Sequence, residues 1–516
     1  MIRERGRGCA RYLEGAVLLA ALLFSLFLAW SVPYSATDDW LWGMEEGLGW
    51  WLGGTLNGRY GGNFFAVIMC RSQVVKTLVM GLVIFGLPLA MALLAAAGKR
   101  KQVLPLFLAG YAGLLLMPPV MWQETYGWVS GFGNYVIPTL LFLVWLLAVR
   151  RAAETRKKLK AWAGGLFLLS FFMGLFVEHL TVLFLGCSLV LVLYALWDRQ
   201  LLFPFLACLA GSVLAVGAMF LNGVVAQLVD TGSALNGLRE LTFSPEEGLW
   251  AAAGDIAGWY VGRLLPIAFL RGVHMALPMA LITACAFWNS ALRPLCLLGL
   301  VPVGCNILIL RTEDFSQPQR VALSALCWLL PLLALLVQRD GREKKARRVL
   351  LYLCAPLALL PLAVTTTLGQ RLYFFSTAIL VLSAVDEAAP LLTRGRMALC
   401  LTALAAVGLM GVWGWRSADV LACSRLRCEL TQQAVEEGRD TLVLPTDRYE
   451  RVVWATRNPW NVEYADYFRR FYQVPDDVTL IFLPAGSFEV WPQVTEEQWE
   501  QRLEFAPSKD YTPSLP

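Results

Sequence analysis

The stretch A-V-L-L-A-A-L-L-F-S-L-F-L-A-W-S-V-P-Y-S-A-T-D-D-W, residues 16–40, indicates the plan of this chain. Residues 16–32 are an apolar run that predicts a helix across the roughly 30 Å hydrocarbon layer of a membrane. Asp38 and Asp39 follow where that helix enters water, and Trp40 comes directly after them. Burying a carboxylate in hydrocarbon costs at least about 2.5 kcal/mol. We therefore expect this pair to be solvated, paired or functional.

The composition places the whole chain in a membrane. Its 516 residues are 58% hydrophobic and only 16% charged, with a mean hydropathy of +0.58, which excludes an ordinary soluble protein. We predict an all-α polytopic membrane protein with about 13 transmembrane helices. The apolar runs are centred near residues 24, 85, 110, 141, 169, 189, 211, 275, 302, 329, 358, 379 and 405.

The basic residues predict the orientation. With the N-terminus in the cytoplasm, about 23 Lys and Arg residues before residue 416 lie in the inner connections and about 9 in the outer ones. An odd number of spans then puts the C-terminus outside, and we expect a bacterial cytoplasmic membrane. Because the basic residues are spread over short loops, they do not indicate nucleic-acid binding. The first run also has the pattern of a signal peptide, with a small-residue site near Ser35 and Ala36.

The chain divides into two regions by composition. Residues 1–415 form the predicted membrane domain, whose large outer loops are 35–71, 122–134 and 222–263. The first loop predicts one or two short interfacial helices. Residues 416–516 have the composition of a soluble segment, with strand patterns at 440–445 and 478–484 and a helical pattern at 459–472. We expect a small exoplasmic α/β domain there.

Two acidic positions near the predicted outer surface are candidate catalytic groups. Asp38 and Asp39 can take a proton from a hydroxyl or hold Mg²⁺ or Mn²⁺, although acidic capping of a following helix is an alternative. Glu178 and His179 interrupt a long apolar stretch that predicts a helical hairpin. Glu178 is a candidate second acid and His179 a proton carrier in a substrate site, unless both only form a polar tip at the interface.

Further candidates lie in the outer loops. Glu124, Tyr126 and Asn134 can line a sugar site, while interfacial anchoring explains the neighbouring tryptophans equally well. Arginines on the outer side are unexpected under the positive-inside rule, and a phosphate ligand would explain them. They are Arg59, Arg311, Arg320 and Arg371. Pairing with Glu313 and Asp314 is the alternative for Arg311.

The motif Y-S-A-T-D-D-W at residues 34–40, the large first outer loop, the many spans and the soluble C-terminal segment resemble the GT-C superfamily of membrane glycosyltransferases. The plan also looks like that of an uncharacterised bacterial membrane-protein family of GT-C-like design. The resemblance implies that Asp38 or Asp39 is a general base or metal ligand, and that Arg371 or Arg320 faces a lipid-linked phosphate. It implies a polyprenyl-phosphate-linked sugar donor among the membrane lipids and a glycan or glycolipid acceptor. No W-W-D signature of oligosaccharyltransferases is present.

Other classes remain open from the sequence. A transporter or flippase is expected to place charges at mid-membrane depth, whereas most charges here lie at predicted span ends. A lipid-linked glycan polymerase or ligase would depend on the outer arginines but not on Asp38 and Asp39. A membrane scaffold without catalysis is a further alternative.

Overall fold

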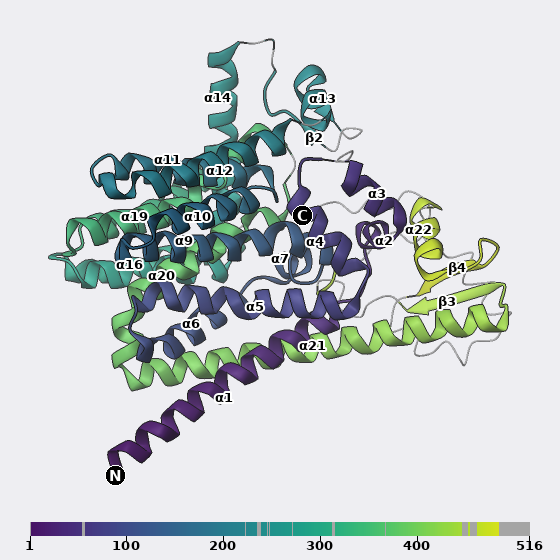
Figure 1. The fold of residues 1–516 in the computed structure, drawn as a ribbon, viewed down its shortest axis with the longest axis horizontal. Helices are drawn as coiled ribbons and strands as arrows, with labels where there is room; N and C mark the ends of the chain where they lie inside the picture. The colour runs from purple at the N-terminus through teal and green to yellow at the C-terminus, as the bar shows by residue number, and fades with distance from the viewer. Residues whose placement is uncertain are drawn as a thin grey trace.

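The computed structural model describes residues 2–483, except 54–56, 222, 235–238, 245, 247, 271, 312–314, 367, 446–451 and 455–461. Most of the described chain is helical, and long helices run side by side (Figure 1). The helices of the bundle are α1 (Ile2–Ser31), α5 (Gln73–Ala96), α6 (Val103–Leu115), α9 (Ile137–Thr155), α10 (Leu159–Met173), α11 (Glu178–Ala195), α12 (Leu202–Phe220), α16 (Val273–Trp288), α17 (Leu300–Arg311), α18 (Gln317–Leu336), α19 (Arg342–Leu357), α20 (Phe374–Arg394) and α21 (Arg396–Glu437). The core centres on α20, since most of its residues are buried.

Polytopic membrane character is confirmed, with fewer full-length membrane helices than the thirteen predicted spans. Among the described residues, ten helical segments are long and apolar enough to cross a membrane. The number is eleven if Leu249–Phe269 and Val273–Trp288, which meet at 91°, form one span. The runs near residues 110 and 169 form α6 and α10, of 13 and 15 residues. At 1.5 Å per residue they reach only about 20 Å, short of the roughly 30 Å hydrocarbon layer.

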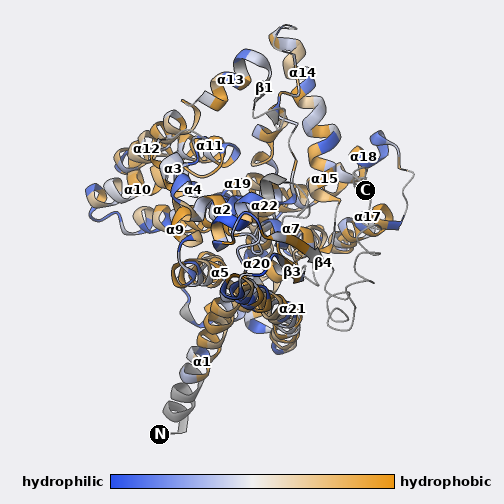
Figure 2. Ribbon diagram, turned by 90° about the vertical axis from the view of Figure 1, so that its right-hand side faces the viewer, coloured by the Kyte–Doolittle hydropathy of each residue, from blue (hydrophilic) through white to orange (hydrophobic). Residues whose placement is uncertain are grey.

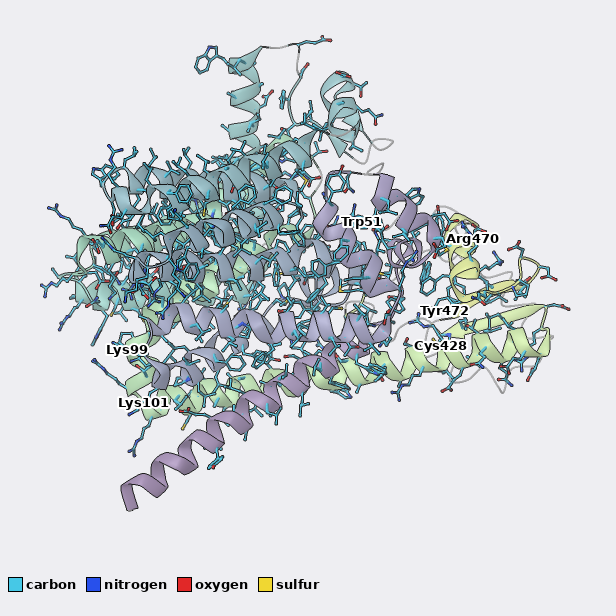
Figure 3. The ribbon with its side chains drawn as sticks, viewed as in Figure 1. Trp51, Lys99, Lys101, Cys428, Arg470 and Tyr472 are labelled. Carbon is cyan, nitrogen blue, oxygen red and sulfur yellow. The ribbon has the colours of Figure 1, made fainter. Side chains whose placement is uncertain are left out.

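The basic turns gather at one end of the bundle. Arg156, after α9, forms an ion pair with Asp198, after α11, at 2.8 Å. The turn after α16 meets the turn after α18, where the amide of Arg339 donates to the carbonyl of Asn289. Lys99 and Lys101 lie at this end in Figure 3, far from Trp51 and Tyr472 at the other end. We call it the basic end.

The short helices lie at the opposite end. The first loop, predicted to hold one or two helices, forms three: α2 (Thr37–Gly43), α3 (Glu45–Gly53) and α4 (Tyr60–Cys70). The second loop contains α7 (Pro119–Glu124), α8 (Val129–Gly131) and the π-helix η2 (Phe132–Val136), which continues into α9. The amide of Gly61 donates to the carbonyl of Leu175, just before α11. This contact fixes the first loop against the α10–α11 turn.

The third loop is less compact than the first two. It contains α13 (Gly223–Thr231), the antiparallel strands β1 (Ser233–Ala234) and β2 (Arg239–Glu240), and α14 (Leu249–Trp259), which leads through η5 (Tyr260–Leu264) into α15 (Leu265–Phe269). Helix α14 projects from the bundle (Figure 1). The amide of Thr242 donates to Val364. Three short 3-10 helices, η1 (Arg100–Gln102), η3 (Arg199–Leu201) and η6 (Arg293–Gly299), precede α6, α12 and α17, whereas η7 (Leu360–Val364) and η8 (Gln370–Tyr373) connect α19 to α20.

A single long helix carries the C-terminal region. α21 continues for 42 residues, so the predicted domain boundary at 415/416 lies inside it. Beyond it, β3 (Thr441–Pro445) and β4 (Thr479–Leu483) pair in parallel, with Thr441 opposite Thr479, and α22 (Val462–Tyr472) lies between them in sequence. The predicted strands are confirmed. We call residues 440–483 the C-terminal unit.

The C-terminal unit packs on α2. The indole of Trp40 meets the ring of Phe468 edge-on at 5.5 Å and lies in one apolar cluster with Leu442 and Leu480. Helix α22 and helix α2 therefore lie together, at the end of the bundle away from the basic turns (Figure 1).

Candidate functional site

Helix α2 presents its two aspartates to different surroundings. Successive residues of a helix point about 100° apart, so the side chain of Asp39 is fully buried while that of Asp38 is exposed. In the described chain neither carboxylate accepts a hydrogen bond from an amide of α2 itself, and the N-cap residue, Ala36, provides no side-chain cap. Helix capping therefore does not explain the contacts of these two residues.

Asp39 joins the first loop to the second. Its Oδ1 accepts hydrogen bonds from the amide of Ser130 at 2.9 Å and from the Ser130 hydroxyl at 2.6 Å. Its Oδ2 is buried and has no hydrogen-bond partner in the described chain. Burial raises the pKa of Asp39 to about 7, against the opposing effects of the Ser130 hydrogen bonds and of Lys76.

Asp38 is exposed but closely surrounded by protein. The surrounding protein raises its pKa by desolvation, while Arg371 and Arg59 act in the opposite direction. Asp38 forms no hydrogen bond or ion pair within the part of the chain that the structure describes. Its carboxylate therefore remains available to a ligand.

Arg59 is held by Glu178. The Arg59 Nη2 atom lies 2.7 Å from Glu178 Oε2, and its Nε donates to both carboxylate oxygens at 3.1 Å. Glu178 is the first residue of α11, where the helix dipole favours a negative charge. Burial alone would lower the pKa of Arg59, but the Glu178 carboxylate outweighs it and raises that pKa. The guanidinium is thus a fixed positive charge, 19% exposed.

Arg371 is held in a similar way by Glu124. The Glu124 Oε2 atom accepts from the Arg371 amide at 3.0 Å and from its Nη1 at 3.2 Å. The Nε of Arg371 donates to the hydroxyl of Tyr135 at 3.3 Å, and the guanidinium lies 5.5 Å from the centre of the Trp128 ring. Tyr135 also interacts with Arg59, so its hydroxyl lies between the two arginines.

The structure thus brings together most of the side chains that the sequence suggested. Asp38, Asp39, Arg59, Glu124, Glu178 and Arg371 form one group, which we call the charged cluster. His179 is buried beside Glu178. Asn134 donates to the carbonyl of Ser130 at 2.9 Å and adjoins the cluster through that residue.

Two candidates lie elsewhere. The ring of Tyr126 packs against Trp122 and Phe132 in the apolar core. Arg320 is exposed at the start of α18, where its Nε donates to the carbonyl of Phe315 at 3.0 Å. Figure 2 shows α18 well apart from α2 and α4. Arg311 is also exposed, and its suggested partners, residues 313 and 314, lie outside the described chain.

Sequence reasoning missed Ser130, Tyr135, Trp128 and Lys76. The first three lie in the second loop, whose aromatic and glycine-rich composition marked the loop but did not distinguish these positions. Lys76 carried a clearer signal, because it is a single charge in the first turn of the apolar helix α5. Such a residue in a membrane helix calls for a partner or a function.

The described part of the C-terminal unit, which includes residues 452–454, contacts the motif at residues 34–40 and the second loop. The Tyr472 hydroxyl donates to the carbonyl of Tyr34 at 3.0 Å, and the Ser35 hydroxyl donates to the carbonyl of Trp454 at 3.1 Å. The amide of Trp454 donates to Gly127, and its ring stacks on Trp128. A side chain at Gly127 would collide with the carbonyl of Val452. These contacts fix residues 34–40, which carry the Y-S-A-T-D-D-W motif, relative to the second loop.

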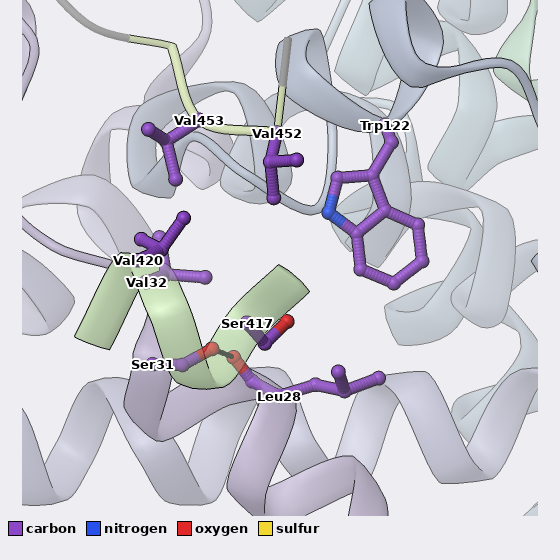
Figure 4. A pocket seen from close by; sticks show the side chains of 8 residues that line it. All are labelled: Leu28, Ser31, Val32, Trp122, Ser417, Val420, Val452 and Val453. Atoms are coloured by element: carbon purple, nitrogen blue, oxygen red, sulfur yellow. Dashed lines mark hydrogen bonds between the residues drawn. The ribbon is translucent and has the colours of Figure 1, made fainter. Parts of the chain in front are cut away.

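An apolar pocket lies beside the motif. Figure 4 shows it between the end of α1, helix α21, Trp122 and the segment around Val452. Two serines, Ser31 and Ser417, are among its lining residues. The lining contains no member of the charged cluster.

The arrangement does not favour a metal site. Within the described residues no group of three or more His, Cys, Asp and Glu side chains is placed to hold a metal ion. Asp38 is exposed, whereas Asp39 is buried and uses one oxygen on Ser130. Mg²⁺ prefers octahedral coordination by oxygen, which these two carboxylates do not provide together. The chemistry proposed below therefore uses no metal.

Comparisons with protein-family models, with curated proteins and with solved structures give no match for this chain. The resemblance to the GT-C superfamily has no support from them. A function must therefore be argued from the geometry of the charged cluster.

The raised pKa of Asp39 predicts a pH dependence of stability. Its pKa is about 7 in the folded protein and near 4 in an unfolded chain, so folding favours the protonated form. The stabilising contribution is complete below pH 4 and is lost as the pH rises through 7. The thermal midpoint of the wild type in detergent, relative to Asp39→Asn, should fall between pH 4 and 7 and then level off. A constant difference across that range would contradict the prediction.

Proposed function

We propose that this protein is a membrane glycosyltransferase that moves a sugar from a polyprenyl-phosphate donor to a hydroxyl of a cell-surface glycan or glycolipid. The observation that carries the proposal is the position of Asp38. It is an exposed carboxylate without a hydrogen-bond partner in the described chain, next to two arginines that are each held by their own glutamate. A free base beside fixed positive charge suits displacement of a phosphate by a hydroxyl.

The proposed reaction assigns a role to each side chain. Asp38 takes the proton of the acceptor hydroxyl, whose oxygen forms a bond to the anomeric carbon of the sugar. The bond from that carbon to the phosphate oxygen breaks, and its electron pair leaves with the polyprenyl phosphate. Arg59 and Arg371 stabilise the charge that develops on the phosphate. Because phosphate is a good leaving group, placement and charge stabilisation supply most of the catalysis.

Glu124 and Glu178 have orienting roles in this proposal. Each carboxylate already binds a guanidinium, whereas Asp38 has no such partner in the described chain. They hold the arginines rigidly, and a charged group that needs no reorganisation stabilises a transition state better than a mobile one. Glu178, a candidate catalytic acid from the sequence, therefore orients Arg59 in this proposal.

The proposed orientation follows the positive-inside rule. The turns that carry most Lys and Arg gather at the basic end, and the charged cluster lies at the other end. We propose a bacterial cytoplasmic membrane with the N-terminus inside, which puts the charged cluster and the C-terminal unit on the exoplasmic side. A flippase or transporter is less favoured, since the cluster lies at the ends of the spans rather than at their centre.

The test of the function is a transfer assay with purified protein in lipid vesicles. Labelled polyprenyl-phosphate sugars are supplied with candidate glycan or glycolipid acceptors, and the glycoside and the released polyprenyl phosphate are measured. We expect both products in equal amounts with at least one donor. An alkaline phosphatase fused after Glu437 should be active in cells, because that position is proposed to be exoplasmic. Movement of intact donor across the bilayer without transfer would favour a flippase instead.

A further inference from the structure

Lys76 is a fully buried cation next to the motif. It lies in the first turn of α5, and none of its side chain is exposed. Its ammonium donates to the carbonyl of Val32 and lies 4.6 Å from the centre of the Tyr34 ring. A carbonyl and an aromatic face stabilise a cation only partly, so a buried ammonium still needs a counter-ion.

Asp39 is the carboxylate that meets this need. It is buried like Lys76, and the two groups act on each other electrostatically. Within the described chain they do not form a direct ion pair, and the Oδ2 atom of Asp39 has no hydrogen-bond partner. The other ionisable groups near Lys76 and Asp39 include Tyr34 and Cys70, which are both neutral at pH 7, and Asp38, which is exposed. Charge balance inside the protein therefore rests on Lys76 and Asp39.

We propose that Lys76 is the counter-ion of Asp39 and that this buried pair is a positioning device, which leaves Asp38 as the carboxylate that meets the substrate. The pair connects three parts of the chain. Lys76 binds the end of α1 through Val32, and Asp39 binds the second loop through Ser130. Helix α2 is thereby fixed, and with it the adjacent residue Asp38, on which Arg59 and Arg371 act electrostatically. The statement about Asp38 rests on the proposed glycosyl transfer, whereas the pairing does not.

A double-mutant cycle tests the pairing. Asp39→Asn, Lys76→Met and the combination are made in the full chain, and thermal midpoints are measured in detergent at pH 7.5, above the pKa of Asp39. Each single variant leaves one buried charge without its partner, whereas the combination removes both. We expect the combined variant to be more stable than the sum of the single effects predicts. Additive effects would overturn the pairing.

A matched control separates charge compensation from packing. Asp38→Asn combined with Lys76→Met changes the neighbouring, exposed carboxylate and should give additive midpoints. If both single variants at Asp39 and Lys76 are too unstable to purify, recovery of monodisperse protein in the double variant supports the pairing. Its failure to recover overturns the pairing.

The transfer assay tests the positioning role separately. We expect Asp39→Asn/Lys76→Met to reduce transfer, because Asp38 is less well placed, but to a smaller extent than Asp38→Asn does, because the general base, worth about 10²- to 10⁴-fold, is still present. Transfer equal to that of the wild type would contradict the positioning role. If the double variant is stable but loses transfer as completely as Asp38→Asn, Asp39 is itself the reacting group and the positioning role is wrong. If the wild type transfers no sugar, the proposed function fails, while the midpoints still decide the pairing.

Discussion

Replacing Asp38 with asparagine is expected to reduce sugar transfer by about 10²- to 10⁴-fold, the usual contribution of a general base. Asparagine has nearly the same shape but cannot take the proton of the acceptor hydroxyl. Because Asp38 is exposed and has no hydrogen-bond partner in the described chain, the loss should appear in kcat without a lower thermal midpoint. Initial rates at saturating donor, with the midpoint measured on the same preparation, check this expectation.

Glu45→Gln is the matched control for that experiment. Glu45 is an exposed carboxylate of the same loop, in a surface ion pair with Arg71 at 3.3 Å. Surface pairs of this kind contribute at most about 1 kcal/mol, so transfer should be close to that of the wild type. Equal transfer by Asp38→Asn and Glu45→Gln would remove Asp38 from the mechanism.

Arg371→Ala is expected to reduce transfer by about 100-fold or more, since this is the typical loss when one charge-stabilising donor is removed from an active site. The guanidinium is fixed by Glu124 and Tyr135 and acts electrostatically on Asp38. Arg371→Lys keeps the charge but not the planar fork that binds Glu124 and a phosphate together. We therefore expect an intermediate loss for the lysine variant.

Arg320→Ala provides the control for the second prediction. The family resemblance implied Arg371 or Arg320 for the phosphate, and the structure places Arg320 on α18, away from the cluster. Arg320→Ala should leave transfer near that of the wild type. If Arg320→Ala abolished transfer and Arg371→Ala did not, the phosphate would bind elsewhere and the proposed site would be wrong.

The apolar pattern of the sequence predicted where helices and strands form, but not how long each helix is. Each predicted apolar run is helical, because a backbone in hydrocarbon must satisfy its own hydrogen bonds. The strands at 441–445 and 479–483 were also expected from their apolar composition. The number of full-length spans, ten or eleven among the described residues, is lower than predicted, because the helices near residues 110 and 169 end after 13 and 15 residues. The 42-residue helix α21 crosses a change in composition that was interpreted as a domain boundary.

For the candidate site, the sequence identified several of the residues but not which of them lie together. Charges on the predicted outer side identified Asp38, Arg59, Glu178 and Arg371 as candidate site residues. Their grouping required the contacts of the first and second loops, including the Gly61 amide on the carbonyl of Leu175. The hydrophobic pattern does not show which loops contact each other, because many arrangements of the loops are compatible with the same apolar helices.

The sequence by itself determined that this chain is a polytopic helical membrane protein with its charges at the ends of the spans, since hydrocarbon excludes both charge and unpaired backbone. Only the tertiary structure decided that Asp38 is exposed while Asp39 is buried, and that Arg371, and not Arg320, acts together with Arg59 on Asp38. The physical reason is that burial and electrostatic pairing depend on neighbours brought together from distant segments, here residues 39, 76 and 130, whose side chains have no common pattern in the sequence.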